Sequence, residues 1–205
     1  MRYFQTLPQL IITDPQRNSK VLTNLLARAS IVQSLLKNPL IFYEYDVQDS
    51  DTPEIIAHKY YGSVDQFWMV LFANEILDPL WDWPLTTTNF NNYINSKYTQ
   101  LELYEVHHYE KIITKMDNIS KILNTETIII DEDTYNSLVP STNTYIFKDK
   151  NGVTTGEQVT VDVKKQAIDN FQYELHLNES KRSIRLINKS YVSQIEEQFK
   201  TLMKA

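Results

Sequence analysis

The sequence predicts an α+β fold: a small core of one strand and two helices, an extended N-terminal arm, a β-rich middle section and a C-terminal amphipathic helix. An aromatic and β-branched run at 40–48 is typical of a strand. Capping residues at 51–54 and a glycine at 62 bound a first helix, and the following stretch, 63–74, repeats apolar residues with the helical period. Further strands are indicated by short alternating runs at 127–131, 144–147 and 159–163.

The composition suits a structural protein better than an enzyme. The chain has 205 residues, 42% of them hydrophobic, which is enough for a real core. It has only 3 glycines, which leaves little material for phosphate-binding loops, whereas 13 tyrosines suit contact surfaces. The net charge of -6 argues against nucleic acid, the lack of cysteine excludes thiolate chemistry, and no apolar run is long enough for a membrane span.

Residues 1–39 read as an N-terminal arm with a short helix. The apolar run Leu10-Ile11-Ile12 lies between Pro8 and Pro15, which favours an extended segment that depends on other surfaces for burial. A helical stripe of apolar residues predicts the short helix over 20–29. The stripe consists of Val21, Leu22, Leu25, Leu26 and Ala29.

Residues 40–109 form the predicted core with a following helix and strand. The first core helix begins after 52, with two possible caps: Thr52 followed by Pro53 as the first helical residue, or Asp51 with Glu54 three residues on. Gly62 supplies the left-handed residue that ends it. Ser63 caps the second core helix. The candidate core residues are Tyr45, Ile56, Tyr60, Phe67, Trp68 and Leu71.

The segment after the second core helix carries Trp81 and Trp83, two residues apart and bounded by prolines. Either indole could pack on the core or contact another protein. We expect a helix over 90–98, capped by Thr88 or Asn89, and a strand over 101–109.

The remaining chain divides into two predicted segments. Residues 110–170 are a β-rich or loosely structured section, with a turn at Asn151-Gly152. Residues 171–205 contain a strand-like run around His176 and an amphipathic helix that requires a partner surface. The candidate protein-interface residues are Trp81, Trp83, Tyr61, Val192, Ile195, Phe199 and Leu202.

We identify no catalytic, cofactor-binding or metal-binding residues. His107 and His108 are adjacent, so on a regular strand they would point to opposite faces and could not share one ion. The nucleophile motif Gly-x-Ser-x-Gly does not occur, and three scattered glycines exclude the usual nucleotide loops. The sequence therefore predicts a non-enzyme without cofactor.

One constellation resembles a LysM module. It runs from Tyr45-Asp46 through the Ser50-Asp51-Thr52 turn, Tyr60-Tyr61-Gly62 and Phe67-Trp68 to a terminal Asn74. Two departures stand out: Ser50 occupies the usual glycine position, and no clear closing strand follows Asn74.

The longer run over 41–99 is similar to the baseplate wedge protein of T-even-like contractile-tailed phages, the gene 53 family. The residues that carry this similarity lie beyond the LysM-like part, in Asp82-Trp83-Pro84-Leu85, Phe90-Asn91-Asn92-Tyr93-Ile94 and Lys97-Tyr98.

This resemblance implies a structural virion protein of the tail baseplate, assembled in the host cytoplasm. It implies binding to other wedge subunits, clamping of neighbouring wedges and proximity to the sheath-initiator protein, without nucleic acid, membrane or small-molecule substrate. A LysM-type module that binds peptidoglycan or chitin is the alternative, and a cell-wall lytic enzyme is a third hypothesis that the missing nucleophile and metal set disfavour.

Overall fold

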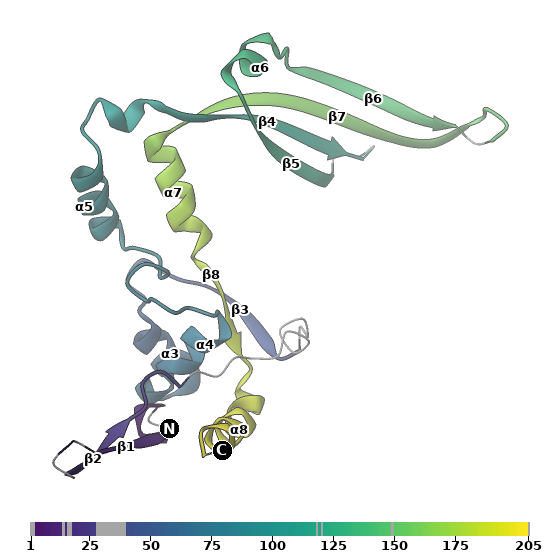
Figure 1. Ribbon diagram of the computed structural model, residues 1–205. Coiled ribbons are helices and arrows are strands. Elements are labelled where there is room, and N and C mark those ends of the chain that lie inside the picture. Colours follow the sequence, from purple (N-terminus) through teal and green to yellow (C-terminus); the bar gives the residue numbers. More distant parts are fainter. Residues whose placement is uncertain are drawn as a thin grey trace. The chain divides into compact units, whose positions relative to one another are not determined.

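Figure 1 shows the computed structural model, which describes residues 3–13, 15, 18–27, 40–117, 119, 121–148 and 150–204. The predicted α+β class is confirmed, with helices and several small antiparallel sheets. The chain divides into two compact units: unit 1 combines Met1–Phe90 with Asn178–Ala205, and unit 2 is Asn91–Leu177. This division differs from the four consecutive segments expected from the sequence, because the two ends of the chain fold together.

Unit 1 contains the predicted first strand and first core helix. Strand β3 (Phe42–Asp46) is followed by helix α3 (Pro53–Tyr61). Of the two possible caps, Thr52 is the one used, since its hydroxyl accepts a hydrogen bond from the Ile55 amide (3.3 Å). Gly62 ends the helix with φ +85°, a left-handed conformation that favours glycine.

The second core helix has two parts, a 3₁₀ turn η1 (Val64–Gln66) and helix α4 (Phe67–Ala73). Ser63 precedes η1 as expected but makes no side-chain capping hydrogen bond. The apolar side of α4 supplies Trp68, Met69, Val70 and Ala73 to the interior, as its broad apolar stripe predicts.

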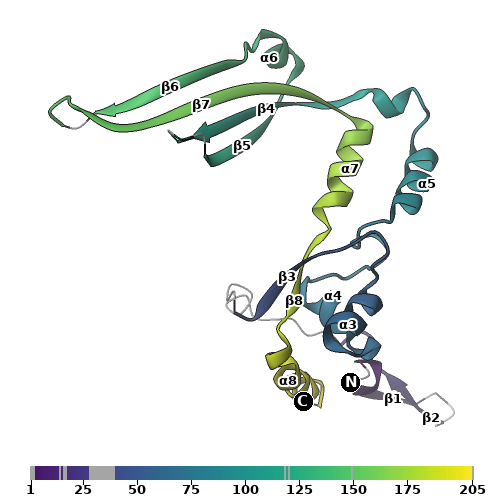
Figure 2. The same cartoon turned by 180° about the vertical axis from the view of Figure 1, so that it is seen from behind.

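The strand that pairs with β3 comes from near the C-terminus. Strand β8 (Ser183–Ile187) pairs antiparallel with β3 so that Glu44 lies opposite Arg185. Figures 1 and 2 both show these two strands side by side. More than 100 residues separate them in the sequence, so no local pattern could reveal the pairing.

The N-terminal arm forms secondary structure of its own. A short helix α1 (Tyr3–Thr6) precedes strands β1 (Gln9–Thr13) and β2 (Ser19–Thr23), which pair as an antiparallel hairpin. The helix predicted over 20–29 is therefore wrong for residues 20–23, and residues 28–29 lie outside the described residues. Strand pairing with β1 outweighs the helical spacing of the apolar residues.

The C-terminal segment consists of a 3₁₀ turn η3 (Lys189–Tyr191) and helix α8 (Val192–Lys204). Helix α8 packs into a cluster with α4 and the N-terminal segment. Tyr3, Trp68 and Phe199 form the aromatic centre of this cluster, with ring centroids 5.0–5.7 Å apart. A second cluster joins β3, α3, α4 and β8 around Ile56, Val70 and Leu186.

Helix α5 (Thr87–Lys97) leads into unit 2, and helix α7 (Asn170–Ser180) leads out of it. Helix α5 begins earlier than predicted: the Thr86 hydroxyl accepts from the Asn89 amide (3.3 Å), so Thr86 caps it instead of Thr88 or Asn89. The strand-like reading around His176 is wrong, because α7 contains it. Asp169 caps α7 by accepting from the Gln172 amide (2.7 Å).

Between these helices lies a four-stranded antiparallel sheet in the order β5-β4-β7-β6. Its strands are β4 (Val106–Met116), β5 (Ile122–Ile130), β6 (Ser141–Lys148) and β7 (Thr154–Asp169). A 3₁₀ turn η2 (Glu102–Tyr104) occupies the first part of the strand predicted over 101–109. Helix α6 (Glu132–Ser137) connects β5 to β6, and Gly152 (φ +80°) lies in the predicted turn before β7.

Candidate interaction surface

The two tryptophans of the 81–83 segment lie in different environments. Trp83 is only 8% exposed, and its indole N–H donates to the Asp51 carbonyl (3.1 Å), which fixes it in the core of unit 1. Trp81 is 64% exposed, and Leu77 and Leu80 in the same loop are also exposed. Of the two, Trp81 is therefore the one that is available to a partner.

The loop of residues 77–82, here called the Trp81 loop, is held by hydrogen bonds within the loop and by one from a distant lysine. The Asp82 carboxylate accepts from the Leu77 and Asp78 amides (3.3 and 3.1 Å). The Asp78 carboxylate accepts from the Leu80 amide (3.0 Å). Lys181 of the segment before β8 donates to the Trp81 carbonyl (2.5 Å). The loop thus presents large apolar side chains from a fixed backbone, which lowers the entropy lost when a partner binds.

Helix α8 directs most of its apolar side chains inward. Phe199 is 3% exposed, and Val192 and Ile195 pack against the same cluster, so the partner surface expected for this helix is supplied by the chain itself. Leu202 is 64% exposed on another side of the helix. Tyr61 is half-buried between the two clusters, and its burial raises the pKa of its hydroxyl.

The six candidate core residues all contribute to the interior of unit 1. Ile56 and Trp68 are buried, and Tyr45, Tyr60, Phe67 and Leu71 are partly buried against the second cluster.

Asp51 is a buried charge that links the turn after β3 to α3. Its carboxylate accepts from Tyr45 Oη (2.6 Å), Lys59 Nζ (2.6 Å) and the Gln48 amide (3.2 Å). Burial alone would raise the pKa of Asp51, but these hydrogen bonds outweigh it and leave the pKa below its usual value. The hydrogen bond to Asp51 also raises the pKa of Tyr45 to about 12.

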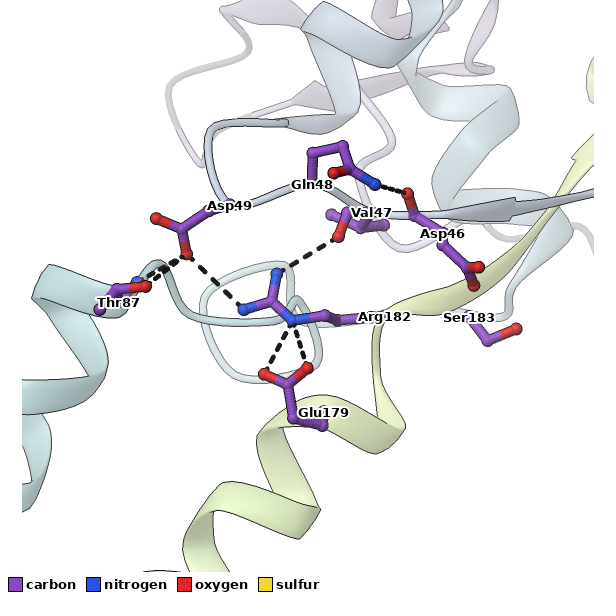
Figure 3. Close-up of a pocket in the computed structure, with 8 residues that line it drawn as sticks. All are labelled: Asp46, Val47, Gln48, Asp49, Thr87, Glu179, Arg182 and Ser183. Atoms are coloured by element: carbon purple, nitrogen blue, oxygen red, sulfur yellow. Dashed lines mark hydrogen bonds and ion pairs between the residues drawn. The ribbon is translucent and has the colours of Figure 1, made fainter.

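A polar hollow of about 500 Å³ lies between the turn after β3 and the start of β8 (Figure 3). Arg182 dominates it: its Nε donates to both carboxylate oxygens of Glu179 (2.8 Å each), and its other nitrogens approach the Val47 carbonyl (3.3 Å) and Asp49 (3.6 Å). Asp49 also accepts from the Thr87 amide (2.7 Å). Arg182 thus links the turn after β3 to the last turn of α7.

A second buried carboxylate, Glu174, organises the helices of unit 2. It accepts from Lys97 Nζ (2.5 Å), Tyr98 Oη (2.9 Å) and Tyr93 Oη (3.3 Å). Burial alone would raise the pKa of Glu174, but the hydrogen bonds outweigh it and lower that pKa. Sequence reasoning missed this network, because α5 and α7 are far apart in the chain.

His107 and His108 lie closer together than expected. A bulge between Val106 and His108 breaks the alternation of β4, so the two Nδ1 atoms are 2.8 Å apart. The opposite-face prediction is therefore wrong. His107 stacks on Tyr173 (3.8 Å between centroids) and His108 Nε2 contacts Glu110 (3.1 Å). In the described part of the chain, no group of three or more ligating side chains could hold a metal ion.

Comparison with models of protein families identifies the family of this chain. The family described as "Base plate wedge protein 53" matches residues 32–204, which is most of the sequence. The chain belongs to this family. A search of curated proteins finds no match.

Membership in the base plate wedge protein 53 family has direct consequences. The protein is a non-catalytic, structural component of the phage tail baseplate in the virion, and other baseplate proteins are its partners. The family match starts after the β1–β2 hairpin and includes both the Trp81 loop and the four-stranded sheet. Among the helices that the structure describes, none has the length and apolar character needed to cross a bilayer.

Proposed function

We propose that this protein binds other wedge subunits and clamps neighbouring wedges together in the baseplate of a T-even-like contractile tail. The observation that carries the proposal is the Trp81 loop, in which a fixed backbone exposes Trp81 with Leu77 and Leu80. Tryptophan is the residue type most often found at binding hot spots. The resemblance of residues 41–99 to the wedge protein of T-even-like phages also implies the sheath-initiator protein as a neighbour.

We also propose that the core of unit 1 is LysM-like, with β8 as its closing strand. Its support is the order β3, α3 and α4, with β8 antiparallel to β3. Asn74, the terminal asparagine of the resemblance, donates to the Val70 and Arg185 carbonyls and accepts from the Arg185 amide, each at 2.8 Å. On this view, residues 75–182 are inserted between the second helix and the closing strand.

Sugar binding is less well supported than protein binding. LysM-type recognition of a sugar polymer requires an accessible site beside the core, and the hollow around Arg182 is the best placed one. Its charged groups already bind one another, and among the residues that line it none is aromatic. A titration with chitin oligomers tests the alternative, and saturable binding would favour it.

The clamp proposal is tested by Trp81→Asp in cells infected with a phage that lacks the natural copy. Loss of a hot-spot tryptophan costs about 2 kcal/mol, or about thirtyfold in affinity. We expect electron microscopy to show far fewer complete baseplate rings. Leu101→Asp, at another exposed apolar residue, is the matched control and should leave the yield of rings unchanged. Normal ring yield with Trp81→Asp would contradict the role of the loop.

A further inference from the structure

The four-stranded sheet of unit 2 has two chemically different faces. Directly paired residues lie on the same face, and successive residues alternate between faces. One face, here called the valine face, carries these side chains: Lys111, Ile113 and Lys115 of β4, Glu126 and Ile128 of β5, Tyr145 of β6, and Val159, Val161, Val163 and Lys165 of β7. The other, the threonine face, carries Thr114, Thr125, Thr127, Thr142, Thr144 and Thr160, together with Ile112, Ile129 and Ile146.

Helix α6 covers one end of the valine face. Tyr135 of α6 lies against Tyr109 of β4, with ring centroids 4.5 Å apart, and Lys165 donates to the Tyr135 carbonyl (2.7 Å). Beyond this helix the face is less covered: Tyr145 is 56% exposed and Ile128 is 39% exposed, while Val161 and Val163 are half-buried. The threonine face also exposes Ile129 and Ile146, so the lysines beside the valines, more than apolar exposure alone, distinguish the valine face.

The charges on the two faces are arranged differently. On the threonine face Asp162 forms an ion pair with Lys164 (3.0 Å), and the Glu110 carboxylate lies 3.1 Å from His108 Nε2. On the valine face Lys111 lies directly opposite Lys165 across the strands, a like-charge pair that opposes folding. The valine face holds one carboxylate, Glu126 opposite Ile113, against the three lysines Lys111, Lys115 and Lys165, so the face has an excess of positive charge.

We infer that the valine face binds another baseplate subunit, through a surface that presents apolar side chains beside carboxylates. A partner carboxylate near Lys111 would relieve its repulsion with Lys165, and apolar partner side chains would cover the valines. A second copy of this face fits poorly, since it would bring lysines against lysines. The inference rests on the proposed function and names the chemistry of one contact within it.

Carbodiimide coupling of purified intact baseplates tests the inference, because this reagent joins an amine to a carboxylate in direct contact. We expect mass spectrometry to find Lys111 or Lys115 joined to an Asp or Glu of another baseplate subunit. Cross-links found solely within this chain, or to a second copy of it, would overturn the proposal. If the wild-type chain were absent from the baseplates, the proposed function itself would fail instead.

Charge reversal gives a second, independent readout. The double variant Lys111→Glu with Lys115→Glu should lower the amount of chain per baseplate by about tenfold or more. Lys164→Glu, on the threonine face, is the matched control and should be incorporated normally. Changing the partner carboxylate found by cross-linking to lysine should restore incorporation of the double variant into baseplates. Wild-type incorporation of the double variant would overturn the proposal, and circular dichroism verifies that both variants are folded.

Discussion

At the scale of single residues, Asp51 holds together the turn that begins the core of unit 1. Its side chain is fully buried and accepts three hydrogen bonds, one of them from Lys59. Asp51→Asn removes the charge and leaves Tyr45 and Lys59 imperfectly paired. We expect a loss of about 2–3 kcal/mol in the free energy of unfolding, measured by urea denaturation at pH 7. Asp46→Asn, at an exposed aspartate, is the control and should change it by less than about 0.5 kcal/mol.

The same residue predicts a pH dependence. The pKa of Asp51 is lower in the folded protein than the ordinary value of about 3.9, so its contribution is fully present above that value. It is lost as the pH falls through the lower folded pKa. The difference in stability between wild type and Asp51→Asn should therefore shrink between pH 5 and pH 2, roughly the range in which such carboxylates titrate. A difference that grows in acid would contradict this assignment.

Residue-level prediction from the sequence succeeded where the signal was local. The Thr52 cap, the Gly62 stop and the inward stripe of α4 each depend on a few neighbouring residues. Local sequence does not predict which of Trp81 and Trp83 is buried, because their environments depend on the distant Asp51 carbonyl and Lys181. Phe199, predicted as an interface residue, is buried against α1 and α4, which no helical pattern could have identified.

At the scale of elements, Asn74 joins the end of α4 to β8 through two hydrogen bonds with Arg185, and a third holds its side chain to the Val70 carbonyl of α4. Asn74→Ala should lower the free energy of unfolding by about 2–3 kcal/mol, because the Arg185 amide and carbonyl lose their partner. Thermal unfolding measures the effect. Asn74→Asp keeps the acceptor but not the donors, so its free energy of unfolding should lie between those of the wild type and Asn74→Ala. A loss below about 0.5 kcal/mol for Asn74→Ala would show that the bridge is unimportant.

In the sheet of unit 2, by contrast, we expect one substitution to raise the stability of the fold. Lys111→Glu replaces a like-charge pair with Lys165 by an opposite-charge pair, which should raise the free energy of unfolding by up to about 1 kcal/mol. Lys115→Glu lies opposite Val161 and should have little effect. Urea denaturation of the isolated variants distinguishes the two. A destabilised Lys111→Glu would show that Lys111 serves the sheet and would weaken the case for a partner.

Element prediction failed where pairing between distant segments decides the structure. The helical spacing at 20–29 was overridden by the β1–β2 hairpin, and the regular alternation expected at His107-His108 was broken by a bulge. The four strands of unit 2 were visible as fragments, but their order in the sheet follows from long-range pairing.

At the scale of the whole molecule, the two ends of the chain complete one unit, and the second unit is formed by the segment between them. The proposed contact surfaces therefore occur in both units: the Trp81 loop in the first and the valine face in the second. A protein that must hold more than one neighbour requires separate surfaces of this kind. The family assignment indicates that these neighbours are other baseplate proteins.

The most direct measurement is the state of the wedges when this protein is removed from the infection. Lysates are separated by sedimentation, and each fraction is viewed by electron microscopy. The clamp account predicts complete but separate wedges without the protein, and joined rings once it is supplied again. Rings at normal yield in its absence, or wedges that fail to form at all, would contradict the claim that it joins finished wedges.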